Sequence, residues 1–182
     1  ERIFGSYPQF VWQDQHGLPQ NGISAVVQTP DGYLWLATAE GVVRFDGVNF
    51  TAFDTVNTPA IKSNNVQSLL VDHHGTLWIG TYGGGLTRRV GAMSDPGEWR
   101  PFHETEGLKV NTGCLVSANG RVYAGTDGTG LYRLSMDGTR FERLKLSLPS
   151  PRVTALFEKD GFLYIGTDEG LTRWSVERDV QP

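Results

Sequence analysis

Three carboxylates and one phenol recur along the chain at intervals of about 41 to 45 residues. They are Glu40, Tyr82, Asp127 and Asp168, and each closely follows a short apolar segment that ends in threonine. Acidic groups beside an aromatic ring suit binding of a polar, carbohydrate-like ligand. Two carboxyl groups about 5 to 10 Å apart are also what a glycosidase needs. Their recurrence indicates that one repeated structural element positions all four side chains.

That element is marked by a five-residue phrase in which an aromatic residue follows an apolar one and threonine comes last. Its four copies are LWLAT at 34–38, LWIGT at 77–81, VYAGT at 122–126 and LYIGT at 163–167. The aromatic residues lie about 41 to 45 positions apart, which is the period of repeat arrays and propellers. The chain is therefore one unit copied four times.

Turn signals surround every copy of the phrase. Turn dipeptides precede it at 31–32, 74–75, 119–120 and 160–161, and a glycine followed by an apolar residue comes after it at 41–42, 85–86, 130–131 and 170–171. Glycine, Asn and Asp at these places suit tight hairpins. A further strand is expected near 49–53, 98–102 and 139–144. Each unit is thus predicted to be a four-stranded antiparallel sheet.

Apolar runs that point to both faces of these strands indicate sheets covered on both sides. The sequence therefore predicts an all-β fold, a single β-propeller segment over residues 1–182; an open solenoid is the alternative. The expected repeats cover about 21–53, 64–102, 110–145 and 150–176.

The run Phe10-Val11-Trp12 is predicted to be an N-terminal strand that belongs to a preceding blade or completes the last one. Propellers have about four to eight blades. The chain is expected to form either a closed ring of four blades or an arc whose bare surfaces pair with another copy.

Composition restricts the possible partners. The formal net charge is −4 at pH 7, which gives no basic footprint for nucleic acid. No stretch approaches the roughly 20 apolar residues that span a bilayer, so this segment is not expected to insert into a membrane. The four histidines show no ligand spacing, and neither a metal nor another cofactor is predicted. The lone cysteine, Cys114, stands in an apolar run and is interpreted as a core residue.

Loops that join blades, and loops after the second strand of a blade, meet on one face of a propeller. We therefore expect a ligand site formed by polar residues of these loops. The candidates are Asn21, Glu40, Asn64, Asn65, Tyr82, Asn111, Asp127, Arg152 and Asp168. Support of turns through side-chain hydrogen bonds is the other explanation for the asparagines. The aromatic residue of each phrase is expected to pack blade against blade instead of binding ligand.

A longer pattern covers the first repeat. It comprises Trp12, Gly-Leu-Pro-Gln-Asn at 17–21, Asp-Gly-Tyr-Leu-Trp at 31–35 and Arg-Phe-Asp-Gly at 44–47. It resembles the two-component regulator propeller family, the periplasmic sensor region of bacterial hybrid histidine kinases and some diguanylate cyclases. The resemblance implies a non-enzymatic, periplasmic recognition module that binds a signal. It also implies that the chain is the N-terminal part of a larger receptor whose further blades are its partners.

Two other functions remain as alternatives. One is a propeller lyase or glycosidase that uses Glu40, Asp127 or Asp168 on a polysaccharide. The other is a protein-interaction propeller that binds no small ligand.

Overall fold

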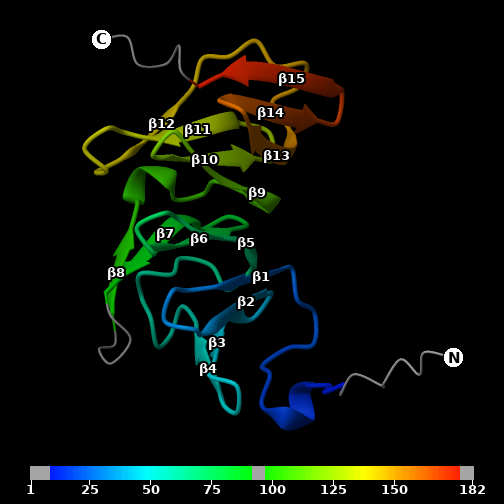
Figure 1. Ribbon diagram of the computed structural model, residues 1–182, viewed down its shortest axis with the longest axis vertical. Helices are drawn as coiled ribbons and strands as arrows, with labels where there is room; N and C mark the ends of the chain where they lie inside the picture. The colour runs from blue at the N-terminus through cyan, green and yellow to red at the C-terminus, as the bar shows by residue number, and fades with distance from the viewer. Residues whose placement is uncertain (1–8, 92–96, 177–182) are drawn as a thin grey trace, which may run out of the picture.

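The computed structural model describes residues 9–91 and 97–176 (Figure 1). Within these residues the strands form three antiparallel sheets of four strands and one of three, each a meander in chain order. The prediction of an all-β propeller segment with four blades is confirmed.

Blades 1 and 2 have four strands each, and a short 3₁₀ helix, η1 (Asp14–His16), precedes the first of them. Blade 1 comprises β1 (Ala25–Gln28), β2 (Leu34–Thr38), β3 (Gly41–Phe45) and β4 (Phe50–Phe53). Blade 2 comprises β5 (Val66–Val71), β6 (Leu77–Thr81), β7 (Gly85–Val90) and β8 (Glu98–Pro101).

The 3₁₀ helix η2 (His103–Thr105) connects blade 2 to the second half of the chain. Blade 3 comprises β9 (Val110–Ala118), β10 (Arg121–Thr126), β11 (Gly130–Leu134) and β12 (Phe141–Arg143). Blade 4 comprises, within the described residues, β13 (Val153–Lys159), β14 (Phe162–Thr167) and β15 (Gly170–Ser175). The repeated phrase is the second strand of every blade.

The four blades form an open array. In Figure 1 they follow one another along the long axis, with β1–β4 at one end and β13–β15 at the other. The first strands β1, β5, β9 and β13 run beside one another in this order. The structure therefore corresponds to the predicted arc and not to a closed ring of four blades.

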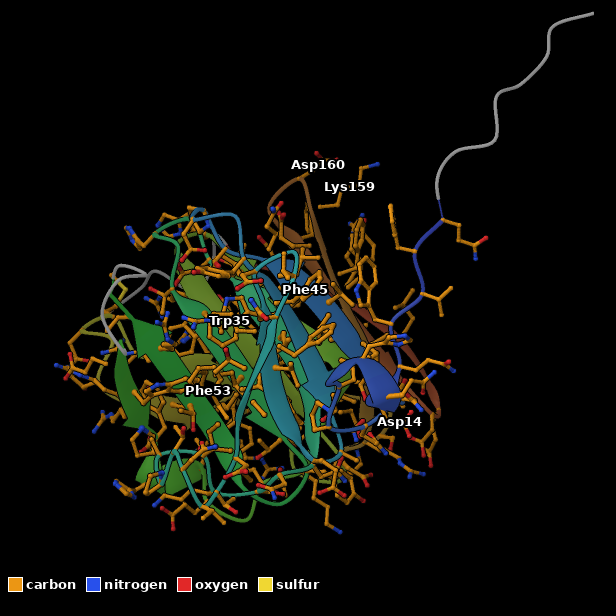
Figure 2. All side chains as sticks on the ribbon, turned by 90° about the horizontal axis from the view of Figure 1, so that it is seen from below. Asp14, Trp35, Phe45, Phe53, Lys159 and Asp160 are labelled. Atoms are coloured by element: carbon orange, nitrogen blue, oxygen red, sulfur yellow. The ribbon has the colours of Figure 1, made fainter. Side chains whose placement is uncertain are left out.

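The aromatic residues of the first three phrases lie between blades. Trp35, Trp78 and Tyr123 are at most 2% exposed, and each belongs to an apolar cluster shared with the next blade. Figure 2, which views the molecule from the blade 1 end, shows Trp35 and Phe53 among the stacked sheets. Their rings are 5.5 Å apart. The expected role of these residues in packing blade against blade is confirmed.

Small residues beside these aromatics let the next blade approach. A Cβ added at Gly80 would lie 2.6 Å from Val110 of blade 3, and one at Gly125 would lie 2.5 Å from Val153 of blade 4. Such contacts are shorter than atoms tolerate, so glycine is required there. In blades 2 and 3 the phrase ends in Gly-Thr because the first strand of the following blade packs directly on that glycine.

The predicted strand at residues 10–12 is wrong. These residues form no strand, and Trp12 instead packs its ring 5.1 Å from Phe45 on the outer face of blade 1. The segment continues through η1 to the buried Leu18, and a Cβ on Gly17 would lie 3.7 Å from Phe50. Figure 2 shows Asp14 of η1 at the same end as Phe45. The apolar run thus places Trp12 against the outer face of blade 1 instead of completing a blade.

The outer face of blade 4 carries the same residue types as the buried faces but is exposed. Leu171 pairs with Gly166 as Leu131 pairs with Gly125. Leu131 is 0% exposed, whereas Leu171 is 68% exposed and Phe157, on the same face, is 61% exposed. Blade 4 therefore ends the described array with a face that is built like an inter-blade contact.

This equivalence gives a matched pair of substitutions. Leu131→Ala should lower the free energy of unfolding by about 2 to 5 kcal/mol, because it removes a fully buried side chain. Leu171→Ala should change it by no more than about 0.5 kcal/mol. Urea unfolding followed by tryptophan fluorescence measures both. Equal losses of unfolding free energy would contradict the assignment of Leu131 to a buried face and of Leu171 to an exposed one.

Burial also determines the chemistry of the cysteine. Cys114 is 0% exposed, and its thiol lies 3.6 Å from the carbonyl oxygen of Val153. Desolvation raises the pKa of Cys114 to about 12. Because the thiolate is the nucleophile, we expect the native protein to react with Ellman's reagent at least about a hundredfold more slowly than the urea-unfolded chain. Similar rates in both states would show that Cys114 is accessible.

Candidate functional site

A connected group of polar side chains crosses three blades on the face formed by the loops after the second strands. The Tyr82 hydroxyl donates to a carboxylate oxygen of Asp127 over 2.9 Å. The other oxygen of Asp127 lies 2.8 Å from Nε of Arg152, and Nη1 of Arg152 lies 3.9 Å from Asp168. We call Tyr82, Asp127, Arg152 and Asp168 the loop-face network.

A lysine extends this network on the blade 2 side. The ammonium group of Lys109 lies 5.1 Å from the centre of the Tyr82 ring, within the range of a cation–π contact. Lys109 was not among the sequence-based candidates. The signal that could have found it is its place directly before Val110, where one blade passes into the next.

The loops that carry the network are fixed by the last residue of each phrase. The hydroxyl of Thr81 donates to the carbonyl of Gly85, and that of Thr126 donates to the carbonyl of Gly130, over 3.1 and 2.7 Å. Gly85 has a φ of +74°, and a Cβ there would lie 2.1 Å from the carbonyl oxygen of Thr105. Threonine and glycine together close a tight loop whose first residue projects from the sheet.

Backbone pairing fixes the same loops against the following blade. Tyr82 forms an isolated antiparallel bridge with Lys109, and Asp127 forms one with Arg152. The amide of Tyr82 donates to the carbonyl of Asn65, and that of Asp127 to the carbonyl of Lys109, both over 2.8 Å. The network is therefore held by main-chain contacts between blades and does not depend on its side-chain contacts alone.

The network is open to solvent to different degrees. The side chain of Asp127 is 18% exposed, whereas those of Arg152 and Asp168 are 56% and 42% exposed. Tyr82 is 36% exposed. The site thus presents one aromatic ring, one guanidinium group and two carboxylates to an incoming ligand.

Glu40 lies outside this network, and its place in the repeat differs from the one that we assigned. In blade 1 two residues separate Thr38 from Gly41, whereas three separate Thr81 from Gly85. The residue that follows the phrase threonine, and so corresponds to Tyr82, is Ala39. Glu40 is the second loop residue, and its amide donates to the Thr38 hydroxyl over 3.1 Å.

The structure places the asparagine candidates in turns and blade junctions, where their side chains bond to neighbouring groups. The side-chain oxygens of Asn21 and Asn64 accept from the amides of Asp14 and Thr55, each over 2.8 Å. The amide group of Asn111 donates to the carbonyl of Val153 over 2.7 Å. These three side chains support the loops in which they lie or which they join.

Asn65 differs from the other asparagines because it leads toward a second polar contact between blades. Its side-chain oxygen accepts from Gln67, and the oxygen of Gln67 accepts from the hydroxyl of Thr112 over 2.6 Å. The Asn65 carbonyl also accepts from the amide of Tyr82. Asn65 therefore links the network to the contact between β5 and β9.

An arginine opposite each phrase aromatic was missed from the sequence. In each blade the aromatic residue of the phrase pairs across the strands with an arginine of the third strand. The pairs are Trp35 with Arg44, Trp78 with Arg88, Tyr123 with Arg133 and Tyr164 with Arg173. The spacing of nine or ten residues from each aromatic could have shown this pattern. These arginines lie within the blades and do not belong to the loop-face network.

Two further observations concern the described part of the chain. Residues 9–91 and 97–176 contain no group of three or more His, Cys, Asp or Glu side chains placed to hold a metal ion. The helices of this part are single 3₁₀ turns, and none has the length or apolar character of a membrane span.

Comparison with known proteins identifies the repeat. The model of the family described as two component regulator propeller matches residues 17–40, 60–83 and 147–169. These matches fall on the first, second and fourth repeats, and the third repeat, whose phrase is VYAGT, is not matched. A search of curated proteins found no match.

Solved structures share the fold. The extracellular domain of the hybrid two component system BT3049 from B. thetaiotaomicron is 23% identical, with a TM-score of 0.77 over 92% of this chain. That of BT4673 from the same organism is 26% identical, with a TM-score of 0.70 over 87% of this chain. Virginiamycin B lyase from Staphylococcus aureus is 13% identical, with a TM-score of 0.58 over 87% of this chain and 57% of its own.

The chain spans 25% of the BT3049 structure and 22% of the BT4673 structure. It thus corresponds to about a quarter of each. Repeat period, blade topology and the three matched segments agree with one another. The resemblance noted in the sequence is confirmed: three of the four repeats contain a segment that matches the two component regulator propeller model, and the chain forms a four-bladed array.

Proposed function

We propose that this chain is a non-enzymatic recognition module in the periplasmic sensor of a bacterial two-component or cyclic-dinucleotide signalling receptor. The repeat family supports this function, as does the likeness to the extracellular domain of the hybrid two component system BT4673. The observation that carries the proposal is the loop-face network, in which side chains from three blades meet on one surface.

The network suits a carbohydrate-like ligand. Sugar hydroxyls both donate and accept hydrogen bonds, so they can bond to the carboxylates of Asp127 and Asp168 and to the guanidinium of Arg152. The Tyr82 ring offers an apolar surface on which a sugar ring can pack. Loops on a rigid scaffold commonly carry binding sites, and these loops are fixed by main-chain contacts between blades.

The site favours binding over hydrolysis. A glycosidase needs one carboxyl group that donates a proton and a second that stays ionised. Asp127 and Asp168 both face the guanidinium of Arg152, so the two carboxyl groups have the same kind of partner and are not set apart as an acid and a base. The likeness to virginiamycin B lyase concerns the fold alone, at 13% identity.

Substitutions in the network test the binding function. We expect a panel of neutral and acidic oligosaccharides to contain a ligand that raises the melting temperature without being cleaved. Arg152→Gln and Asp168→Asn should each lower the affinity for this ligand by about tenfold, the effect of losing one charge-assisted hydrogen bond. Glu40→Gln is the matched control, since it removes a loop carboxylate outside the network.

Unfolding of the same variants separates binding from folding. Arg152→Gln should cost less than about 1 kcal/mol of stability, because its ion pairs are partly exposed. Turnover of an oligosaccharide that Asp168→Asn abolishes would instead establish the glycosidase. Unchanged affinity in both network variants would exclude the loop-face network as the ligand site.

We infer that a further propeller blade packs on the outer face of blade 4, either a blade of the same receptor or one of a second copy. Equivalent faces of blades 1, 2 and 3 are each covered by the next blade. For Gly166, the counterpart of Gly80 and Gly125, the three described atoms nearest to an added Cβ all belong to Ala155 of its own blade.

Sedimentation distinguishes the two sources of that blade. If a second copy covers the face, the 182-residue chain dimerises as its concentration rises, and Leu171→Arg abolishes the dimer. If a further blade of the receptor covers it, the chain stays monomeric, and extension by the following repeat lowers the exposure of Tyr164, which lies beside Phe157 on that face, to a fluorescence quencher. A monomer whose extended form shows unchanged quenching would refute the inference.

A further inference from the structure

A cavity of about 320 Å³ lies between blades 2 and 3. It is formed by three turns at the ends of the sheets opposite the loop-face network: β5 to β6, β9 to β10 and β11 to β12. Its volume is within the range of small-molecule sites, about 300 to 1,000 Å³. Its polar lining includes Asp72, His73, His74, Arg88, Arg121 and Asp137.

Arg88 spans the cavity from one blade to the next. Its guanidinium packs 5.8 Å from the Trp78 ring and 5.5 Å from the Phe102 ring. Nη1 donates to the carbonyl of Gly138 in the β11–β12 turn over 3.2 Å. The buried Nε has no hydrogen-bond partner among the described residues. A guanidinium has five N–H donors, so this group retains capacity for an acceptor.

The environment of Arg88 leaves its positive charge incompletely compensated. Burial, and secondly the neighbouring Arg100, lower the pKa of Arg88. Glu98 and Asp72 oppose this effect. An anion placed beside the guanidinium would therefore be stabilised by a charge that the protein does not fully neutralise.

The carboxylates in the cavity wall already have donors from their own turns. Asp72 accepts from the amides of His74 and Thr76 and, over 2.8 Å, from Nε1 of Trp78. Asp137 accepts from Ser135 and Thr139, and these hydrogen bonds lower the pKa of Asp137 to about 2. Both aspartates are thus occupied as acceptors within the turns that they stabilise.

Other polar groups of the wall carry hydrogen-bond donors. Arg121 reaches into the cavity with Nη2 against the sulfur of Met136. The rings of His73 and His74 are exposed and lie 3.8 Å apart, centre to centre. The two arginines offset the charge of the two aspartates. The hydrogen-bond donors of the arginines and histidines that have no acceptor in the turns therefore decide which ligand is favoured.

We propose that this cavity binds a small oxyanion, a carboxylate carried on an apolar group, between Arg88, Arg121 and the His73–His74 pair. The guanidinium groups supply charge-assisted hydrogen bonds to the oxygens. Leu134, Val122 and Met136 supply the apolar part of the lining. The site is separate from the loop-face network, and it stands or falls independently of the proposed function.

Titration of the intact chain with benzoate tests the site. The imidazole NMR signals of His73 and His74 should shift and saturate in the millimolar range, and the neutral analogue benzyl alcohol should leave them unchanged. Inorganic phosphate and sulfate form the second arm. If phosphate and sulfate both bind more weakly than benzoate, the ligand is an organic carboxylate. If either binds more tightly than benzoate, the ligand is an inorganic anion and the proposed ligand class is wrong.

Variants connect the signal to the residues. Arg121→Gln should lower the affinity for benzoate by about tenfold. Arg88→Lys, which keeps the charge but loses the planar fork, should weaken it by a similar factor. Arg140→Gln is the matched control, because this exposed arginine pairs with Glu142 outside the cavity. Arg88 packs against aromatic rings, so melting temperatures of all variants are measured in parallel.

Two results would refute the proposal: benzoate shifts that do not saturate, or the same affinity in Arg121→Gln as in Arg140→Gln. Tyr82→Phe provides the comparison with the other face, and it should leave benzoate binding unchanged. A benzoate response lost in Tyr82→Phe but kept in Arg121→Gln would move the anion site to the loop-face network.

Discussion

The fold depends on the contact between the broad faces of neighbouring sheets. Every blade is apolar on both faces, so each face must be covered by another element. The contact has two parts, a large aromatic that fills the space between blades and a small residue that lets the next first strand approach. Trp78 and Gly80 provide them between blades 2 and 3, with Val110 as the partner. Loss of either part would open the array.

The same contact creates the loop-face network. Tyr82, Asp127 and Asp168 each follow the phrase that packs the blades, so the stacking that buries the phrase also brings their loops to one surface. The isolated bridges of Tyr82 with Lys109 and of Asp127 with Arg152 then fix the first two of these loops against the next blade. Residues of the loop-face network and residues that pack the blades are therefore adjacent in sequence but separate in position, because the tight loop after threonine turns the chain out of the sheet.

The repeat made most of the fold predictable. Period, turn residues and apolar runs specify blades, since each is a local property that recurs four times. The end of the array could not be predicted in this way. Phe10-Val11-Trp12 has the composition of a strand, but its partner is decided by long-range packing, and Trp12 covers Phe45 instead of pairing with a strand.

The site was predictable to a similar degree. Counting from the phrase placed Tyr82, Asp127 and Asp168 on one face, and the structure brings them together with Arg152. Their role in binding a ligand stays a prediction. Glu40 was misassigned within the repeat: the residue directly after the phrase threonine is Ala39 in blade 1, as Asp168 is in blade 4. The cavity between blades 2 and 3 was also missed, since His73 and Arg88 lie in different strands and turns whose proximity comes only from pairing and stacking.

Native-state hydrogen exchange tests directly whether coverage of both faces stabilises each blade. The amides of β10 and β14 are paired on both sides within their sheets, but blade 3 lies between two blades and blade 4 has an exposed outer face. If stacking on both faces stabilises a blade, the amides of β14 should exchange through a local opening whose free energy is lower than that of the opening which exposes the amides of β10. Equal protection of the two strands would contradict this account, because each blade would then be stable without its neighbour.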